Sequence, residues 1–126
     1  MASCNLEIFG ANPANIQWRV VRGDTAEILV EFFEADEETE YDIANWIFTA
    51  TAYNPRNEIT DDLEVSVEGA SVKIIAPADV TEFWGTGVRG RVAELVFDLQ
   101  AEINGKVWTP VVGTIYVIGD VSGAIL

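Results

Sequence analysis

The chain contains 126 residues, 49% of them hydrophobic and 22% charged, a balance typical of one folded domain. Its 21 acidic and 7 basic residues give a net charge of −14. This charge argues against nucleic acid and anionic membranes as partners, because both bind clusters of Lys and Arg. The absence of His and the single Cys remove the commonest general base, the commonest zinc ligand and any internal disulfide. We therefore expect no enzyme, no cofactor and no metal site.

The N-terminal residues 1–14 show no strand pattern, and we expect them to form an arm. They contain neither the basic nor the apolar segment of a secretion signal, and no run in the chain approaches the roughly 20 apolar residues of a membrane span. Cys4 has no basic neighbour in sequence that would activate its thiol. We expect a soluble protein that is made in a cytosol and has no membrane partner.

The next segments, 15–20 and 26–33, alternate apolar and polar residues and predict two strands. Between them lies Arg22-Gly23-Asp24, a tripeptide that marks integrin ligands in other proteins. Integrin binding requires an exposed extracellular loop. The sequence shows neither a secretion signal nor cysteines for a disulfide, so it does not indicate an extracellular protein. Gly23 can supply the free φ of a bend, and Asp24 or Thr25 can bond main-chain N–H groups across it. We predict a structural turn and not an adhesion site.

Two acidic stretches follow, at 34–42 and 57–62. Several carboxylates could hold calcium, but the first stretch lacks the Gly of an EF-hand loop and does not match its ligand spacing. We expect a solvated loop at 34–42, and we expect Asp61-Asp62 to end a loop.

Alternation returns in 45–53, 63–69 and 71–76, which predicts three more strands, with a hairpin at Gly69-Ala70. The segment 77–85 begins with Pro, carries an early acidic residue and ends with Gly, which predicts one or two helical turns. We expect this short crossover near 78–84 to join the two sheets, with Phe83 and Trp84 closing one end of the core.

The longest predicted strand, 91–103, runs into Asn104-Gly105, a pair that favours a type I′ hairpin turn. Strict pairing from this turn would place three aliphatic residues of the following strand beside Glu94 and Asp98. A slip of one residue removes that conflict. Because Pro110 cannot donate to a ladder, we predict a β-bulge between Thr109 and Gly113.

These elements predict an all-β fold, a single antiparallel β-sandwich of the immunoglobulin-like kind. We assign 1–14 to an N-terminal arm, 15–121 to the sandwich and 122–126 to a C-terminal tail.

Candidate binding residues are aromatic or terminal. Parity places Trp18 and Trp46 on core faces, whereas Trp84 and Trp108 could stay exposed and contact partners or a carbohydrate. The apolar chain end supplies two further candidates, Ile125 and Leu126. A pair of carboxylates could also hydrolyse a glycoside, but no pair among 21 acidic residues stands out.

Four motifs carry a resemblance: "RGDTAEILVEF", "YDIANWIFTATAYNPR", "PADVTEFW" and "NGKVWTPVVGTIYVIGDVSG". In this order they resemble the β-sandwich virion proteins of tailed bacteriophages. The likeness is to the N-terminal domain of upper baseplate proteins and to small tail-associated sandwiches of actinobacterial phages. It spans roughly residues 16–121 and rests on structural motifs. Upper baseplate proteins continue into a receptor-binding region that has no counterpart here, so we do not transfer that role.

The resemblance implies a non-enzymatic structural subunit of a virion, docking at the tail tip, baseplate or fibre attachment through its edges, loops and termini. Its partners would be other virion proteins, within a symmetric homo-oligomer. A capsid decoration protein is the first alternative, and a carbohydrate- or cell-surface-binding module is the second.

Overall fold

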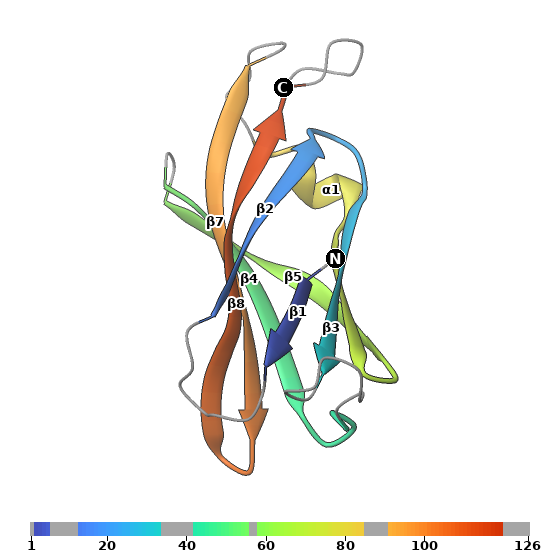
Figure 1. The fold of residues 1–126 in the computed structure, drawn as a ribbon. Coiled ribbons are helices and arrows are strands. Elements are labelled where there is room, and N and C mark those ends of the chain that lie inside the picture. The colour runs from blue at the N-terminus through green and yellow to red at the C-terminus, as the bar shows by residue number, and fades with distance from the viewer. Residues whose placement is uncertain (1, 6–12, 34–41, 56–57, 85–90, 120–126) are drawn as a thin grey trace.

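The computed structural model describes residues 2–5, 13–33, 42–55, 58–84 and 91–119. Eight strands and one short helix lie within these ranges (Figure 1). In chain order the elements are β1 (Ala2–Asn5), β2 (Ala14–Val21), β3 (Ala26–Phe33), β4 (Ile47–Asn54), β5 (Ile59–Glu68), β6 (Ser71–Ala76), α1 (Ala78–Thr81), β7 (Val92–Ile103) and β8 (Lys106–Ile118). No described segment forms a helix long and apolar enough to cross a membrane.

The strands form one mixed sheet in the order β1-β3-β6-β5-β4-β7-β8-β2. The all-β class is confirmed, but the expectation of purely antiparallel pairing is wrong. β1 runs parallel to β3, and β2 runs parallel to β8. The alternating pattern could not reveal this difference, because a half-buried strand shows the same period whichever direction its neighbour runs.

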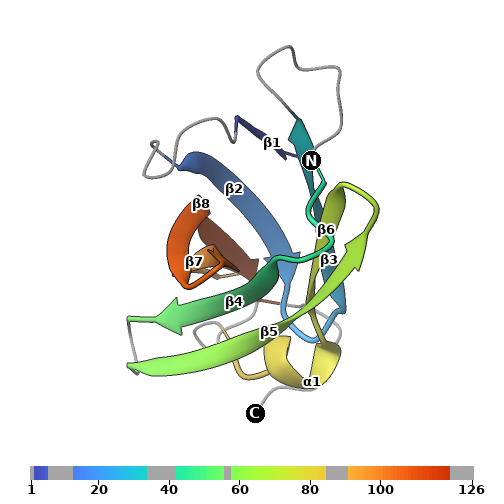
Figure 2. The ribbon, with the colours of Figure 1, turned by 90° about the horizontal axis from the view of Figure 1, so that it is seen from below.

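The sheet bends within β5, which pairs with a different strand along each half of its length. Its first half, through Leu63, pairs with β4, and its second half, from Glu64, pairs with β6. The two parts of the sheet therefore face each other across a common centre, and the arrangement is nearly a barrel (Figure 2). Two separate sheets, and with them the immunoglobulin-like sandwich, are not confirmed.

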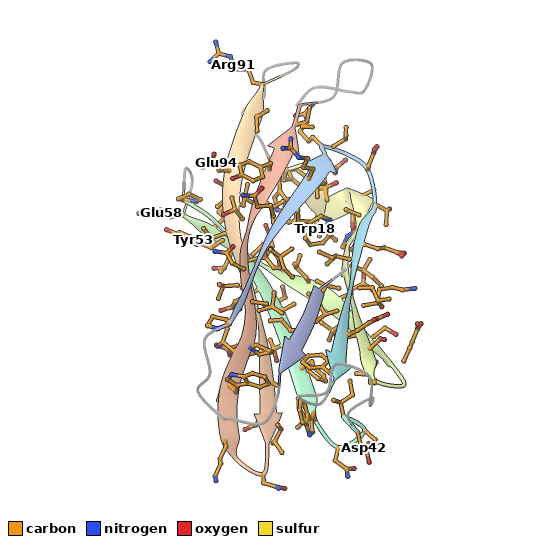
Figure 3. The ribbon with its side chains drawn as sticks, viewed as in Figure 1. Trp18, Asp42, Tyr53, Glu58, Arg91 and Glu94 are labelled. Atoms are coloured by element: carbon orange, nitrogen blue, oxygen red, sulfur yellow. The ribbon has the colours of Figure 1, made fainter. Side chains whose placement is uncertain are left out.

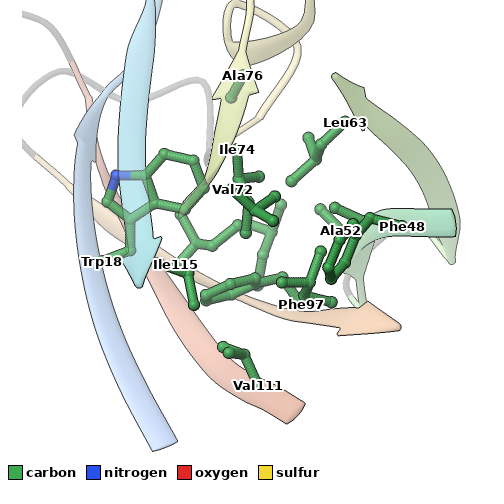
Figure 4. Packing of buried hydrophobic residues seen from close by; sticks show 14 of the residues in the cluster. Trp18, Phe48, Ala52, Leu63, Val72, Ile74, Ala76, Phe97, Val111 and Ile115 are labelled. Atoms are coloured by element: carbon green, nitrogen blue, oxygen red, sulfur yellow. The ribbon is translucent and has the colours of Figure 1, made fainter. Parts of the chain in front are cut away.

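The core fills this centre with the inward side chains of nearly every strand (Figure 4). In β7 the buried residues alternate with exposed ones, as predicted: Leu95, Phe97, Leu99 and Ala101 are buried. Trp18 of β2 packs its ring edge-on against Phe97, with 5.6 Å between ring centres. Trp18 therefore lies on the core face, as its parity predicted.

The predicted β-bulge is present in the ribbon of β7 and β8. Ala101 pairs with Trp108 but Leu99 pairs with Val111, so two residues, Thr109 and Pro110, lie opposite one residue of β7. The slip turns the aliphatic residues of β8 into the core: Val111, Ile115 and Val117 are fully buried. Avoiding the burial of carboxylates beside them is the physical reason for the slip.

The predicted crossover is the helical turn α1, which follows Pro77 and joins β6 to the segment before β7. Trp84 closes the core with 2% exposure, but Phe83 is 64% exposed, so the expectation that both rings are buried is wrong. Successive residues in a helical turn point in different directions, whereas residues three apart share a face. Thr81 and Trp84 are three apart, and both are buried.

The N-terminal arm contains a strand that the sequence did not reveal. Ala2–Asn5 form β1, which pairs with Val30–Phe33 of β3 at one edge of the sheet. β2 then starts at Ala14, within the range assigned to the arm. The predicted tail, 122–126, lies outside the described residues.

Candidate functional site

The outward side chains of β5, β4, β7, β8 and β2 form a continuous face, which we call the outer face. The strand registers align these side chains in rows that cross all five strands. One row contains Thr60, Tyr53, Val96, Thr114 and Gln17, and the next contains Asp62, Thr51, Asp98, Val112 and Asn15. Tyr53 and Glu94 both point outward on this side of the molecule (Figure 3).

A hollow of about 570 Å³, which we call the trough, lies across these two rows. Its lining combines apolar side chains with four hydroxyl groups, an amide and a carboxylate: Val96, Phe97, Val112, Thr51, Tyr53, Thr60, Thr114, Asn15 and Asp98, with Gly113. Its size falls within the range of small-molecule pockets in proteins, about 300–1,000 Å³.

Gly113 explains why the strands come together so closely beneath the trough. A Cβ at this position would lie 2.6 Å from a ring carbon of Phe97 and closer still to the carbonyl oxygen of Ile16. The missing side chain lets β2 approach β8 and leaves room on the core side of the sheet for the ring of Phe97. The sequence suggested Gly113 as part of the bulge, but its role is this close approach.

Asp98 is the charged group that lines the trough. Burial raises the pKa of its carboxyl group above the ordinary 3.8, because desolvation disfavours the charged form. Among the residues that the structure describes, its carboxylate has no ion-pair or hydrogen-bond partner. The trough therefore holds a partly desolvated negative charge that the described part of the chain does not neutralise.

Both ends of the outer face carry exposed apolar side chains. At one end Ile47 and Val107 flank Glu102 in a single row, with 62% and 61% of their surfaces exposed. At the other end Val92 and Val21 flank Ile118. Single exposed apolar side chains are common on protein surfaces, but their alignment on one face provides an apolar surface for contact with another protein.

Of the four predicted partner-contact residues, the structure describes two, Trp84 and Trp108, and it buries both. Trp84 and Trp108 lie in the core with 2% and 7% exposure, so their rings offer no face to a partner or a sugar. Trp108 is buried because the hairpin register places it opposite Ala101. The indole of Trp84 donates a hydrogen bond of 2.9 Å to Oδ2 of Asp61. Ile125 and Leu126 lie outside the described residues.

The Arg22-Gly23-Asp24 segment is the turn between β2 and β3, and Gly23 has the positive φ of 87° that a bend requires. The side-chain hydrogen bonds to this turn come from Thr81 of α1, where Asp24 or Thr25 had been expected, and the Asp24 N–H bonds the Val21 carbonyl across the turn. The Gly23 N–H donates to Oγ1 of Thr81, and that hydroxyl donates to the Asp24 carbonyl. Arg22 is 6% exposed, which is incompatible with receptor contact through its side chain.

The second predicted turn lies at Asn104-Gly105, between β7 and β8. Both residues have positive φ, 51° and 81°, as a type I′ turn requires.

The acidic stretches show no metal site within the described residues, where no three His, Cys, Asp or Glu side chains gather. Residues 34–41 lie outside the described ranges. The carboxylate of Asp42 accepts a hydrogen bond from the Ala44 N–H, a turn contact. Asp61 and Asp62 lie within β5, so the expectation that they end a loop is wrong. Residues 59–63 alternate as a strand, with Leu63 inward.

Comparisons with known proteins give structural likenesses but no match in sequence. No protein family matches the sequence, and no curated protein matches it. Among solved structures, the N-terminal domain of ORF48 of phage TP901-1 is similar over 96% of this chain and 100% of its own. The sequence identity is 12% and the TM-score is 0.44, so this likeness does not bear on function.

Proposed function

We propose that the chain is a non-enzymatic structural subunit of a tailed-phage virion, placed at the tail tip, baseplate or fibre attachment. Two observations support the proposal. The four motifs of the sequence resemble virion sandwich domains, and the outer face presents aligned apolar side chains on rigid strands. The second observation carries the proposal, because it provides a contact surface on the described part of the molecule.

The chemistry of the outer face suits docking better than catalysis. Strands β4, β7 and β8 hold Ile47 and Val107 in fixed positions, so little conformational entropy is lost when a partner covers them. Glu102 lies between them and would form part of a polar rim. The partners we propose are other virion proteins, with the chain repeated as a symmetric homo-oligomer. With a net charge of −14, neither nucleic acid nor an anionic membrane is a fitting partner.

The first alternative is a capsid decoration protein, which would use the same kind of face at a different place on the particle. The second is a carbohydrate- or cell-surface-binding module. With Trp84 and Trp108 buried, that module would have to use the ring of Tyr53, which is 37% exposed at the trough.

Immunogold electron microscopy of particles from the phage that encodes the chain tests this proposal. We expect gold at the distal end of the tail. Labelling over the capsid would favour the decoration protein, and absence of the chain from purified particles would overturn the proposal.

Variants of the outer face then test the docking surface. Ile47→Glu and Val107→Glu should prevent incorporation of the chain into particles. Val67→Glu is the matched control, because Val67 is also an exposed strand residue, 45% exposed, but lies beside the β5–β6 turn. Equal incorporation of all three variants would contradict docking through the outer face.

A further inference from the structure

We infer that the trough is a socket for a basic side chain, Arg or Lys, of the protein that docks on the outer face. The inference rests on the proposed function and specifies the partner's chemistry. Asp98 would pair with the cation, and the apolar and hydroxyl groups around it would hold the rest of the side chain.

The charge of the trough is the first argument. Asp98 lies between Thr51 of β4 and Val112 of β8, and neither neighbour can neutralise it. Asp62 lies in the same row beyond Thr51, roughly 10 Å from Asp98 by the usual spacing of strands, and adds negative charge. A cation entering here gains Coulomb energy and relieves the cost of a desolvated carboxylate.

The chain's own cations do not occupy this place, as far as the structure describes them. Arg19 lies over the ring of Tyr116, 5.8 Å from its centre, and Lys73 lies 3.9 Å from both Glu27 and Glu68 in the other part of the sheet. In the proposed socket, the positive charge that matches Asp98 comes from the docking protein.

The lining of the trough fits the remainder of a basic side chain. Lys and Arg carry an apolar stem, which can pack on Val96 and Val112. The ring of Tyr53 can receive a cation on its face, and the hydroxyl of Thr51 can accept an N–H bond. A neutral sugar could use the same hydroxyls but would leave the charge of Asp98 uncompensated. A metal ion would find one carboxylate, with the next one two strands away.

The socket can be tested by NMR with small probes, and this test does not require the partner to be known. The isotope-labelled chain is titrated with N-acetyl-arginine amide and N-acetyl-lysine amide. The neutral probes are N-acetyl-citrulline amide, which has nearly the shape of the arginine probe, and N-acetylglucosamine. We expect the cationic probes to shift the amide signals of Val96–Leu99 and Val112–Thr114, and we expect the neutral probes to leave them in place.

Two isosteric variants assign the effect to one carboxylate. Asp98→Asn should weaken binding of N-acetyl-arginine amide by about fivefold or more, with a dispersed spectrum showing that the fold persists. Asp62→Asn removes the same charge from the same row but outside the trough, and it should change the affinity by less than twofold.

Four results would overturn the inference. Shifts spread over the whole surface, or equal weakening by both variants, would show general attraction to an acidic protein. Trough shifts with N-acetylglucosamine and none with the cationic probes would show a glycan site.

Localisation on particles is a separate result. A chain that is found at the tail but does not bind the cationic probes overturns the socket alone. A chain that binds them but is absent from particles overturns the virion assignment and removes the phage partner of the socket.

Discussion

The hydroxyl of Thr81 donates a hydrogen bond of 2.7 Å to the main-chain carbonyl of Asp24, 57 residues earlier in the chain. The same oxygen accepts a bond of 3.1 Å from the N–H of Gly23. One fully buried side chain therefore satisfies one N–H and one carbonyl of the turn that carries the chain from β2 to β3.

Replacing Thr81 by Val keeps the shape of the side chain but leaves the Gly23 N–H and the Asp24 carbonyl without this partner. We expect the free energy of unfolding to fall by about 2 kcal/mol in urea denaturation, because unsatisfied buried groups bear their full desolvation cost. Thr81→Ser keeps the hydroxyl and should lose about 1 kcal/mol or less, the contribution of one methyl group. Equal losses in the two variants would contradict a role for the hydrogen bonds.

The bond between Trp84 and Asp61 fixes the indole at the end of the core. Asp61→Ala should lower the free energy of unfolding by about 1–2 kcal/mol, since the bond has a charged acceptor. Asp61→Asn keeps an acceptor oxygen and should cost less. Asp62→Ala is the matched control, because its exposed side chain points to the outer face. A double-mutant cycle with Trp84→Phe should show coupling for Asp61 only, and its absence would be the contrary result.

Gly113→Ala tests the close approach of β2 and the ring of Phe97. The backbone can accept Ala, but the new methyl group would overlap the Ile16 carbonyl and that ring. We expect a loss of about 1–3 kcal/mol in thermal or urea unfolding, as overpacked sites show. Thr114→Ala, one residue later on the outer face, should stay within about 1 kcal/mol of the parent. A fully stable Gly113→Ala variant would show that the strands can separate at no cost.

The Asp98 carboxyl predicts a pH dependence of stability. Burial raises its pKa above 3.8, so the folded state binds this proton more tightly than the unfolded state. The protonated Asp98 carboxyl group therefore contributes to stability below pH 3.8, and this contribution is lost as the pH rises through the pKa of the folded state. The groups nearest to it, Thr51, Val112 and Asn15, are uncharged, and Asp62 lies further along the row.

Asp98→Asn should therefore be slightly more stable than the parent at pH 7, by less than about 1 kcal/mol because water screens the partly exposed group. The advantage should shrink as the pH is lowered to 3.8, measured as the difference between the two unfolding curves. A variant that is less stable than the parent at pH 7 would mean that the carboxylate has a stabilising partner.

Local rules predicted the strands, the bulge and the two turns because each depends on neighbouring residues. Strict pairing would have put Val111 on the same face of the sheet as Glu94, and alternation along the two strands was enough to show this conflict. Pro110 then indicated where the pairing would slip. The parallel pairing of β2 with β8 could not be predicted, since it depends on which strand, distant in sequence, lies beside β2 in the sheet. β1 was missed because its four residues show no alternating pattern.

The candidate site was less predictable than the fold. Trp84 and Trp108 attracted attention as large aromatic side chains, yet size and aromaticity favour the core as much as a surface. The trough depends on residues from five strands, and only the register brings Asp98, Thr51 and Val112 side by side. Asp98 did not stand out in the sequence, because Glu94, Gln100 and Glu102 lie on the same polar side of the predicted strand.

The parallel pair of β2 and β8 has a consequence for how the chain reaches its fold as it is made. Ala14 lies beside Val111, and among the described strands β2 pairs only with β8. During translation β2 leaves the ribosome early but has no neighbour until β8 follows, whereas β4, β5 and β6 can already form their hairpins. Until then the apolar side of β2, with Trp18 and Val20, remains exposed to solvent, so the last of the described strands shelters one of the first.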